Sequence, residues 1–213
     1  MLTDETYPKI FTWLAIGLLI TFLTGYTLSL NEVALAKLLS GGSYIVLVIL
    51  EVAVAIFLSV RINKMSKTTA TICYLLYTFL TGITFGGIFI SFKLSSIIAI
   101  FLASAVVFGL AALIGYTTKK DMSKFGSFLI IALLGIIIMS IINIFLKING
   151  IQFIISIIGV VIFIGYTMYD INRIKQLDFY NEESGAIYGA FQLYLDFINI
   201  FIELLNLFGD TKD

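Results

Sequence analysis

The stretch LYLDFINIF, Leu193–Phe201, places an aspartate among residues that otherwise belong in a lipid bilayer. A carboxylate at the centre of a membrane helix costs about 2.5–3.5 kcal/mol on insertion scales, so such a group normally has a partner or a function. Asp196 is therefore the first candidate functional residue of the chain. The residues around it decide the fold.

The composition of the whole chain is that of a membrane protein. Of the 213 residues, 60% are hydrophobic and 12% are charged, and the mean hydropathy is +1.08. Apolar runs of about 20 residues, the length that crosses a bilayer, recur between short polar breaks. We predict one all-α membrane domain over residues 1–213, without a soluble domain. Its seven spans are expected at 10–30, 44–60, 69–92, 95–116, 126–145, 151–172 and 185–208.

The residue inventory argues against several function classes. No G-x-x-x-x-G-K-[ST] loop is present, which disfavours an ATP-driven pump. Histidine is absent and Cys73 is the only cysteine, which argues against zinc, histidine-ligated haem and an intramolecular disulfide. The remaining ion ligands are oxygen atoms, which suit protons and hard cations such as Ca²⁺. We expect no bound cofactor and no nucleic-acid partner.

Lysine and arginine are distributed unevenly between the two sides of the predicted membrane. The side that holds the N-terminus carries Lys9, Arg61, Lys64, Lys67, Lys119, Lys120, Lys124, Arg173 and Lys175, and the opposite side carries Lys37, Lys93, Lys147 and Lys212. The positive-inside rule then places the N-terminus in the cytoplasm and the C-terminus outside. Scarce Arg beside abundant Ile, Lys and Asn indicates an AT-rich genome and favours a bacterial plasma membrane.

Polar residues form a stripe along the last predicted span. Spacings of 4, 3, 4 and 3 residues place them on one face about 80° wide, at about 100° per residue. They are Gln192, Asp196, Asn199, Glu203 and Asn206. Interhelical hydrogen bonds explain such a seam in many bundles. Two carboxylates in one seam favour the alternative, a water-lined path that handles ions.

Asp170, in the last turns of the sixth span, is the candidate partner of Asp196. Both residues are 13 positions from Glu183 in the connecting linker, so they come level if the two helices form an antiparallel hairpin. The alternative is an interfacial ion pair between Asp170 and Arg173 at i+3. We favour the carboxyl pair on this spacing.

Two further charges lie in or beside the second span. Glu51 is interpreted either as a protonated carboxyl that makes one interhelical hydrogen bond or as part of the polar path. Arg61 is interpreted either as an interfacial anchor that extends to the headgroups or as a partner for carboxylates, which arginine binds through two parallel hydrogen bonds.

Gly82 and Gly86 form a GxxxG pattern in the third span. Small residues at this spacing let membrane helices approach closely, although glycine is also common in membrane helices in general. We predict that the pattern marks a packing face.

The segments GAFQLYLDFINIFIELLNLFG (189–209) and MYDINRIK (168–175) resemble the signature of the Bax inhibitor-1 family, the transmembrane Bax inhibitor motif proteins, in a compact bacterial form. ILEVAVAIFLSVR (49–61) and YTFLTGITFGGIF (77–89) are also similar to family segments. The resemblance implies a seven-helix bundle with the last helix at its centre, acting as a pH-sensitive calcium leak. Asp170 and Asp196 match the family's hydrogen-bonded aspartate pair, and Arg61 is the candidate for an arginine that latches onto it.

Other function classes fit less well. An intramembrane aspartyl protease also uses two aspartates, one of them after a tyrosine, but Asp196 follows Tyr194-Leu195 and not Gly-x-Gly, and no proline follows Pro8. A retinal protein needs a lysine that the last span lacks. A cation/proton exchanger is the main alternative, although no pair of broken helices is visible.

We therefore predict a non-enzymatic calcium leak with Ca²⁺, protons and the bilayer as its partners. Calcium is the transported ion, and Asp170 and Asp196 are expected to form a weak calcium site.

Overall fold

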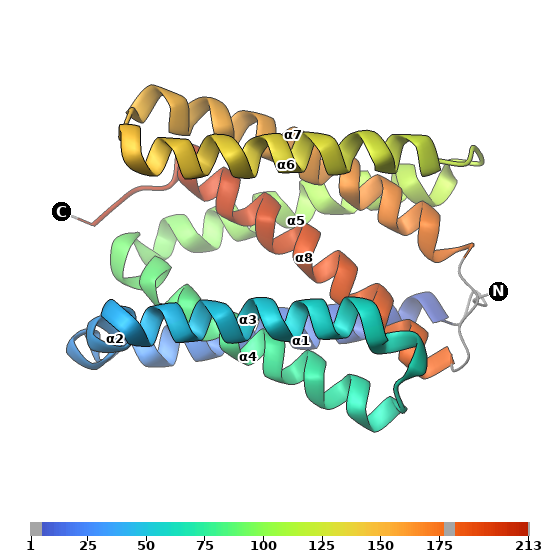
Figure 1. The fold of residues 1–213 in the computed structure, drawn as a ribbon, viewed down its shortest axis with the longest axis horizontal. Helices are drawn as coiled ribbons and strands as arrows, with labels where there is room; N and C mark the ends of the chain where they lie inside the picture. The colour runs from blue at the N-terminus through green and yellow to red at the C-terminus, as the bar shows by residue number, and fades with distance from the viewer. Residues whose placement is uncertain (1–5, 177–181, 213) are drawn as a thin grey trace. The chain divides into compact units, whose positions relative to one another are not determined.

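The computed structural model describes residues 6–176 and 182–212, with the side chains of Asn63 and Asn149 left aside. Within those ranges the chain is all-helical, and seven helices are long and apolar enough to cross a membrane (Figure 1). The α-helices are α1 (Thr6–Ser29), α2 (Glu32–Leu38), α3 (Gly41–Arg61), α4 (Lys67–Ser91), α5 (Leu94–Thr117), α6 (Ser123–Leu146), α7 (Asn149–Ile174) and α8 (Glu182–Phe208). The seven predicted spans are confirmed, and each end lies within a few residues of its expected position.

The chain divides into two compact units. The first comprises residues 1–94, 177–194 and 211–213, and the second comprises residues 95–176 and 195–210. The helix α8 belongs to both, since its N-terminal half lies in the first unit and its C-terminal half in the second. This helix is buried on its polar and its apolar side, as the exposed fractions of Asp196 (4%) and Leu205 (1%) show. It is therefore an interior helix, as predicted.

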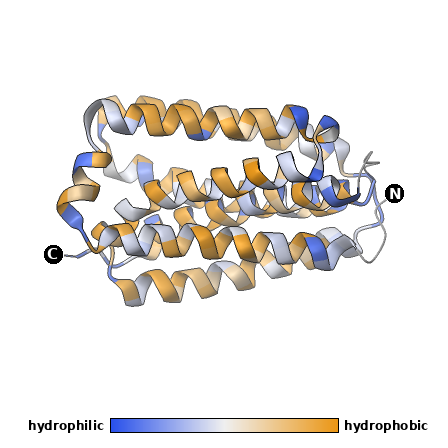
Figure 2. Ribbon diagram, turned by 90° about the horizontal axis from the view of Figure 1, so that it is seen from below, coloured by the Kyte–Doolittle hydropathy of each residue, from blue (hydrophilic) through white to orange (hydrophobic). Residues whose placement is uncertain are grey.

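The hydropathy of the helices follows their role as membrane spans. Figure 2 shows apolar residues along the lengths of the helices and the more hydrophilic ones gathered near their ends. On α6, only Gly126 and Leu129 are buried among the described residues. Most of this helix is therefore an apolar surface suited to contact with lipid chains.

In the first unit, α1 and α4 pack through glycines. A Cβ atom added at Gly82 would lie 2.6 Å from the Cβ of Thr24, and one added at Gly25 would lie 3.1 Å from the carbonyl oxygen of Gly82. At Gly86 the neighbour is Leu35 of α2, with its Cδ2 atom 2.6 Å from an added Cβ. The GxxxG pattern is thus a packing face, which confirms the prediction.

Hydrogen bonds between buried polar groups also join α1, α4 and the first half of α8. The hydroxyl of Thr21 donates to the carbonyl oxygen of Thr78 at 2.9 Å. The hydroxyl of Tyr194 lies 2.6 Å from the hydroxyl oxygen of Thr21 and is therefore the donor in that second bond. The hydroxyl of Tyr74 donates to the carbonyl of Trp13 at 2.8 Å. Buried tyrosines are stable when their hydroxyl groups find such partners.

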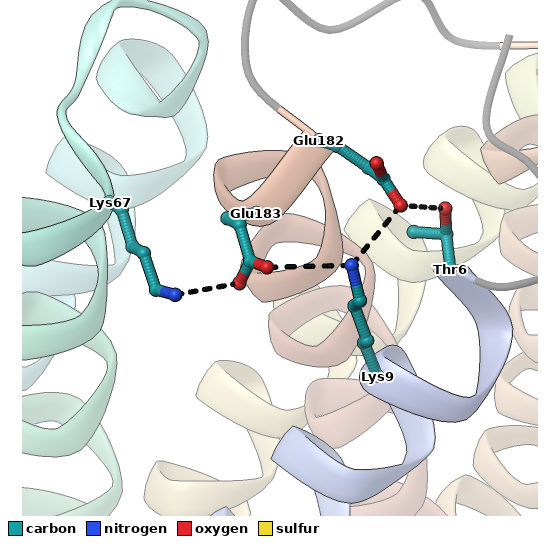
Figure 3. Close-up of polar contacts among 5 residues, drawn as sticks. All are labelled: Thr6, Lys9, Lys67, Glu182 and Glu183. Carbon is teal, nitrogen blue, oxygen red and sulfur yellow. Dashed lines mark hydrogen bonds and ion pairs between the residues drawn. The ribbon is translucent and has the colours of Figure 1, made fainter.

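An ionic cluster joins the N-terminal ends of the same three helices (Figure 3). The ammonium group of Lys9 lies 3.3 Å from a carboxylate oxygen of Glu182 and 3.4 Å from one of Glu183. Lys67 pairs with the other oxygen of Glu183 at 3.1 Å, and Thr6 donates to Glu182 at 2.9 Å. Each pair is substantially exposed, so its individual contribution to stability is small.

Two local elements have no counterpart in the predicted spans. Helix α2 begins at a side-chain cap in which Asn31 accepts from the backbone N–H of Ala34 at 3.1 Å. At the C-terminus, the backbone N–H of Lys212 donates to Ser91 at 2.9 Å, and its ammonium group donates to the carbonyl of Phe89 at 2.8 Å. These bonds satisfy carbonyl groups that the end of α4 leaves without helical partners.

In the second unit, glycines bring α5 and α6 against α7. A Cβ atom added at Gly115 of α5 would lie 2.8 Å from the Cα of Met168 and closer still to its carbonyl oxygen. A Cβ added at Gly126 of α6 would collide with the ring of Tyr169. Both contacts hold the turn of α7 that immediately precedes Asp170.

Candidate functional site

Asp170 and Asp196 are both buried in the second unit. Asp170 lies in the last turns of α7 and Asp196 near the middle of α8, and their side chains belong to residues that are 5% and 4% exposed. Their carboxyl groups are close enough to interact electrostatically. The Oδ2 atom of Asp196 accepts no hydrogen bond within the described part of the chain. The site therefore brings two acidic groups together and leaves one oxygen available to a proton, a water molecule or a cation.

Tyr166 is a third polar group at this site, and the sequence analysis did not include it. It lies one helical turn before Asp170, and its hydroxyl interacts electrostatically with both aspartates. The signal that identifies it is the spacing, because residues at i and i+4 share a helix face. Its hydroxyl is able both to donate and to accept a hydrogen bond, so Tyr166 fits either protonation state of the pair.

Hydrogen bonds fix the end of α7 that carries Asp170. The side-chain amide of Asn172 donates to the carbonyl of Thr118 at 2.9 Å, and Lys175 lies 4.4 Å from the centre of the Tyr116 ring. Partial burial lowers the pKa of the Lys175 ammonium group. Arg173 lies over the ring of Tyr169 at 5.9 Å. Asp170 is buried at this end of α7, and its pairing with Asp196 and not with Arg173 stays a prediction.

The residues of the polar stripe on α8 differ in exposure. Gln192, in the first unit, and Asn199, in the second, are half-buried, whereas Asn206 is exposed. The side-chain amide of Asn199 donates to the carbonyl of Leu195 in its own helix at 2.7 Å. The Oε2 atom of Glu203 is buried and has no hydrogen-bond partner in the described residues. The helix places all five residues on one face, but their role as an ion path stays a prediction.

Glu51 and Arg61 lie in the first unit. Glu51 accepts a hydrogen bond from the hydroxyl of Thr81 at 2.7 Å, which links α3 to α4 and matches the interpretation of a single interhelical bond. Arg61 is the last residue of α3, and its side chain is exposed. Its role as a latch on the aspartate pair stays a prediction.

Comparison with known proteins identifies the family. A family model described as "Inhibitor of apoptosis-promoting Bax1" matches residues 4–213, almost the whole chain. The chain belongs to the Bax inhibitor-1 family. The resemblance noted in residues 168–175 and 189–209 is thereby confirmed, and the protein is an integral membrane protein.

Bacterial members of the Bax inhibitor-1 family are similar to the chain over most of its length. The inner membrane protein YbhL of Escherichia coli K12 is 36% identical, with 98% of this chain and 93% of that protein covered. An uncharacterized protein of Borreliella burgdorferi is also 36% identical, over 100% of this chain and 95% of its own. The protein RP147 of Rickettsia prowazekii is 32% identical, over 96% and 89%.

The described residues of this Bax inhibitor-1 family chain contain no group of three or more His, Cys, Asp or Glu side chains able to hold a metal ion. A calcium ion at Asp170 and Asp196 would need its other oxygen ligands from backbone carbonyls and water, both of which Ca²⁺ accepts. Such a site would bind weakly, and its existence stays a prediction.

Proposed function

We propose that the protein is a pH-sensitive calcium leak channel in which Asp170 and Asp196 attract the ion and sense protons. The observation that carries the proposal is the burial of two electrostatically interacting carboxyl groups, one on α7 and one on α8. Two like charges in an apolar interior repel each other, and a proton or a cation between them relieves the repulsion. The same pair is thus able to respond to pH and to bind Ca²⁺.

The chemistry of the pair suits binding better than covalent reaction. Calcium accepts carboxylate, hydroxyl, carbonyl and water oxygens in a flexible geometry. An ion that passes through a channel must bind strongly enough to enter and weakly enough to leave, which two carboxylates completed by water satisfy. In this proposal the aspartates hold ions and protons, and no bond of a substrate is broken.

The proposal includes a direction of pH response. The N-terminus faces the cytoplasm of a bacterial plasma membrane, and Arg61 binds the ionised pair and closes the path. Acidification protonates the pair and releases Arg61, so the leak rises. Full protonation then removes the charges that attract Ca²⁺, so the rise levels off or reverses at lower pH.

Purified protein in liposomes that contain a calcium indicator tests the function. We expect Ca²⁺ to run down its gradient without ATP and to continue when the proton gradient is collapsed. A flux that stops when the proton gradient is collapsed would support the alternative, a cation/proton exchanger. Vesicles with no flux above that of protein-free vesicles at any pH would contradict both.

The Asp196→Asn variant tests the role of the pair in the same vesicles. It removes one charge while keeping the size of the side chain, so the pH response should be lost. Asp210→Asn is the matched control, because the side chain of Asp210 is exposed beyond the end of α8. A wild-type pH response in the Asp196→Asn protein would remove the pair from the mechanism.

A further inference from the structure

A second acidic site lies in the second unit, between α7 and α8. The Cδ atom of Glu203 occupies the space beside Gly159, where an added Cβ atom would lie 2.9 Å from it. The absence of a side chain at Gly159 therefore provides the room that the carboxyl group uses. The Oε2 atom of Glu203 is buried there and accepts no hydrogen bond from the described residues.

Ser156, on α7, is a second buried polar group near this position. The residue is fully buried, and its hydroxyl has no hydrogen-bond partner in the described part of the chain. It lies three positions before Gly159, so it shares the helix face that receives the carboxyl group of Glu203. Buried polar atoms in folded proteins are nearly always paired, and an ion or a water molecule between α7 and α8 would pair both oxygens.

The charge of Glu203 has no basic partner in the helices of the second unit. Across α5, α6, α7 and residues 195–208 of α8, the basic residues are Lys124, in the first turn of α6, and Arg173, in the last turn of α7. Lys147 lies between α6 and α7, 12 residues before Gly159. Arg173 is 14 residues from Gly159, or roughly 21 Å along the helix. No ion pair joins Glu203 to a basic side chain within the described residues, so a cation or a proton from solution is the species that would compensate its carboxylate.

We propose that Glu203 and Ser156 form a second calcium-binding site on the path through the second unit. Glu203 follows Asp196 by seven residues, which places the two carboxyl groups on the same face of α8 and roughly 10 Å apart along its axis. Two weak sites in succession let an ion enter one while another leaves, as conduction requires. The proposal rests on the proposed leak and names a further site within it.

Calcium flux tests whether the site is used. The Glu203→Gln variant keeps the size of the side chain and removes its charge, so flux should fall several-fold while the shape of the pH response stays that of wild type. Ser156→Ala removes one neutral ligand and should give a smaller fall. Asp210→Asn serves again as the control, with wild-type flux expected. Wild-type flux in Glu203→Gln would overturn the proposal.

Chemical labelling tests binding without relying on flux. Dicyclohexylcarbodiimide reacts with carboxyl groups in apolar surroundings, and mass spectrometry of peptides locates the label. In a protein carrying Asp170→Asn and Asp196→Asn, Glu203 should be labelled, and millimolar Ca²⁺ should protect it. Gly159→Ala should weaken the protection because its methyl group displaces the carboxyl, whereas Gly135→Ala, which has no neighbour within 4 Å of its added Cβ, should not.

The two tests separate this site from the leak itself. If Ca²⁺ protects Glu203 from labelling but the protein conducts no Ca²⁺ at all, the binding site is supported and the proposed function is contradicted. Labelling that Ca²⁺ does not change, or no labelling of Glu203 at all, would overturn the site whatever the flux.

Discussion

The two units of the chain are built from similar apolar helices, but they treat their buried polar groups differently. In the first unit, Glu51 accepts a hydrogen bond from Thr81, and Thr21 joins Tyr194 to the backbone of α4. In the second unit, oxygen atoms of Ser156, Asp196 and Glu203 are buried without hydrogen-bond partners in the described residues.

This difference separates a structural role from a functional one. Unpaired buried oxygens reduce stability, so they persist where another occupant or a change of protonation compensates. The second unit is therefore where we place ion binding. The first unit contains the hydrogen bonds of Glu51 and Thr21 described above and tightly packed helices.

The largest difference is expected between two variants that each neutralise one carboxyl group, Asp170 in the second unit and Glu51 in the first. Asp170→Asn should abolish a flux response of about tenfold per pH unit, the steepness that one titrating group provides. Glu51→Gln keeps a hydrogen-bond acceptor for Thr81 and should leave the pH response unchanged. The measurement is calcium flux from liposomes between pH 6 and 8. Equal effects of the two variants would contradict the assignment of pH sensing to the second unit.

The next effect concerns the glycines that hold each unit together. Gly115→Ala forces a methyl group against the backbone of Met168, two residues before Asp170. Overpacking of this kind costs about 1–3 kcal/mol, so the unfolding temperature in detergent should fall, and the displaced Asp170 should shift the pH response. The methyl group of Gly82→Ala would meet Thr24 in the first unit. This variant should therefore lower the unfolding temperature without shifting the pH response.

Gly109→Ala is the matched control for both glycine variants. An added Cβ at Gly109 has no neighbour within 4 Å, and alanine is the better helix former. Its unfolding temperature should equal or exceed that of wild type. A pH response shifted by Gly82→Ala as much as by Gly115→Ala would show that the first unit also positions the aspartates.

Features that depend on the spacing of residues within one helix were predictable from the sequence. Seven spans follow from long apolar runs, because the bilayer imposes both length and composition on them. The spans depend on one helix at a time, which is why local spacing was sufficient to predict them. The pairing of Asp170 with Asp196 is predicted from their equal distances to the linker and stays a prediction.

Contacts between distant segments were beyond the sequence patterns. A Cβ atom added at Gly115 would meet the backbone of Met168, and Lys9 forms ion pairs with Glu182 and Glu183. No periodic spacing in the sequence connects the residues of these contacts. Tyr166 was missed for a different reason, since its distance from Asp170 was visible but a tyrosine in an apolar span carries no distinct signal. The capping of α4 by Lys212 likewise depends on tertiary structure.

A smaller effect is expected from Arg61, a residue of the first unit with a predicted action on the second. Arg61→Ala should raise calcium flux about threefold at pH 7.5–8 and flatten its pH dependence. The effect is small because the Arg61 side chain is exposed and solvent screens its charge, which limits such a pair to about 1 kcal/mol. Arg61→Lys should restore the wild-type response only in part, because an ammonium group lacks the bidentate geometry. A curve superimposable on wild type would make Arg61 an interfacial anchor.

The smallest expected effect lies at the start of α6, outside the membrane spans. Asp121 accepts hydrogen bonds from the backbone N–H of Ser123 at 2.9 Å and from its hydroxyl at 2.5 Å, and these bonds lower the pKa of the carboxyl group. The stabilisation of the folded state by these bonds is present above the unfolded-state pKa of the carboxyl group and is lost as the pH falls through its lower folded-state pKa.

Hydrogen exchange of the first turn of α6 should therefore be accelerated by Asp121→Ala at pH 6. At a pH low enough to protonate Asp121 in the folded protein, wild type loses the same bonds and the difference should shrink. Lys120→Ala, a neighbouring exposed substitution, is the control and should leave exchange unchanged. Since Asp121 is fully exposed, calcium flux should also be unaffected, and a change in the pH response of flux would extend the sensing region beyond the buried aspartates.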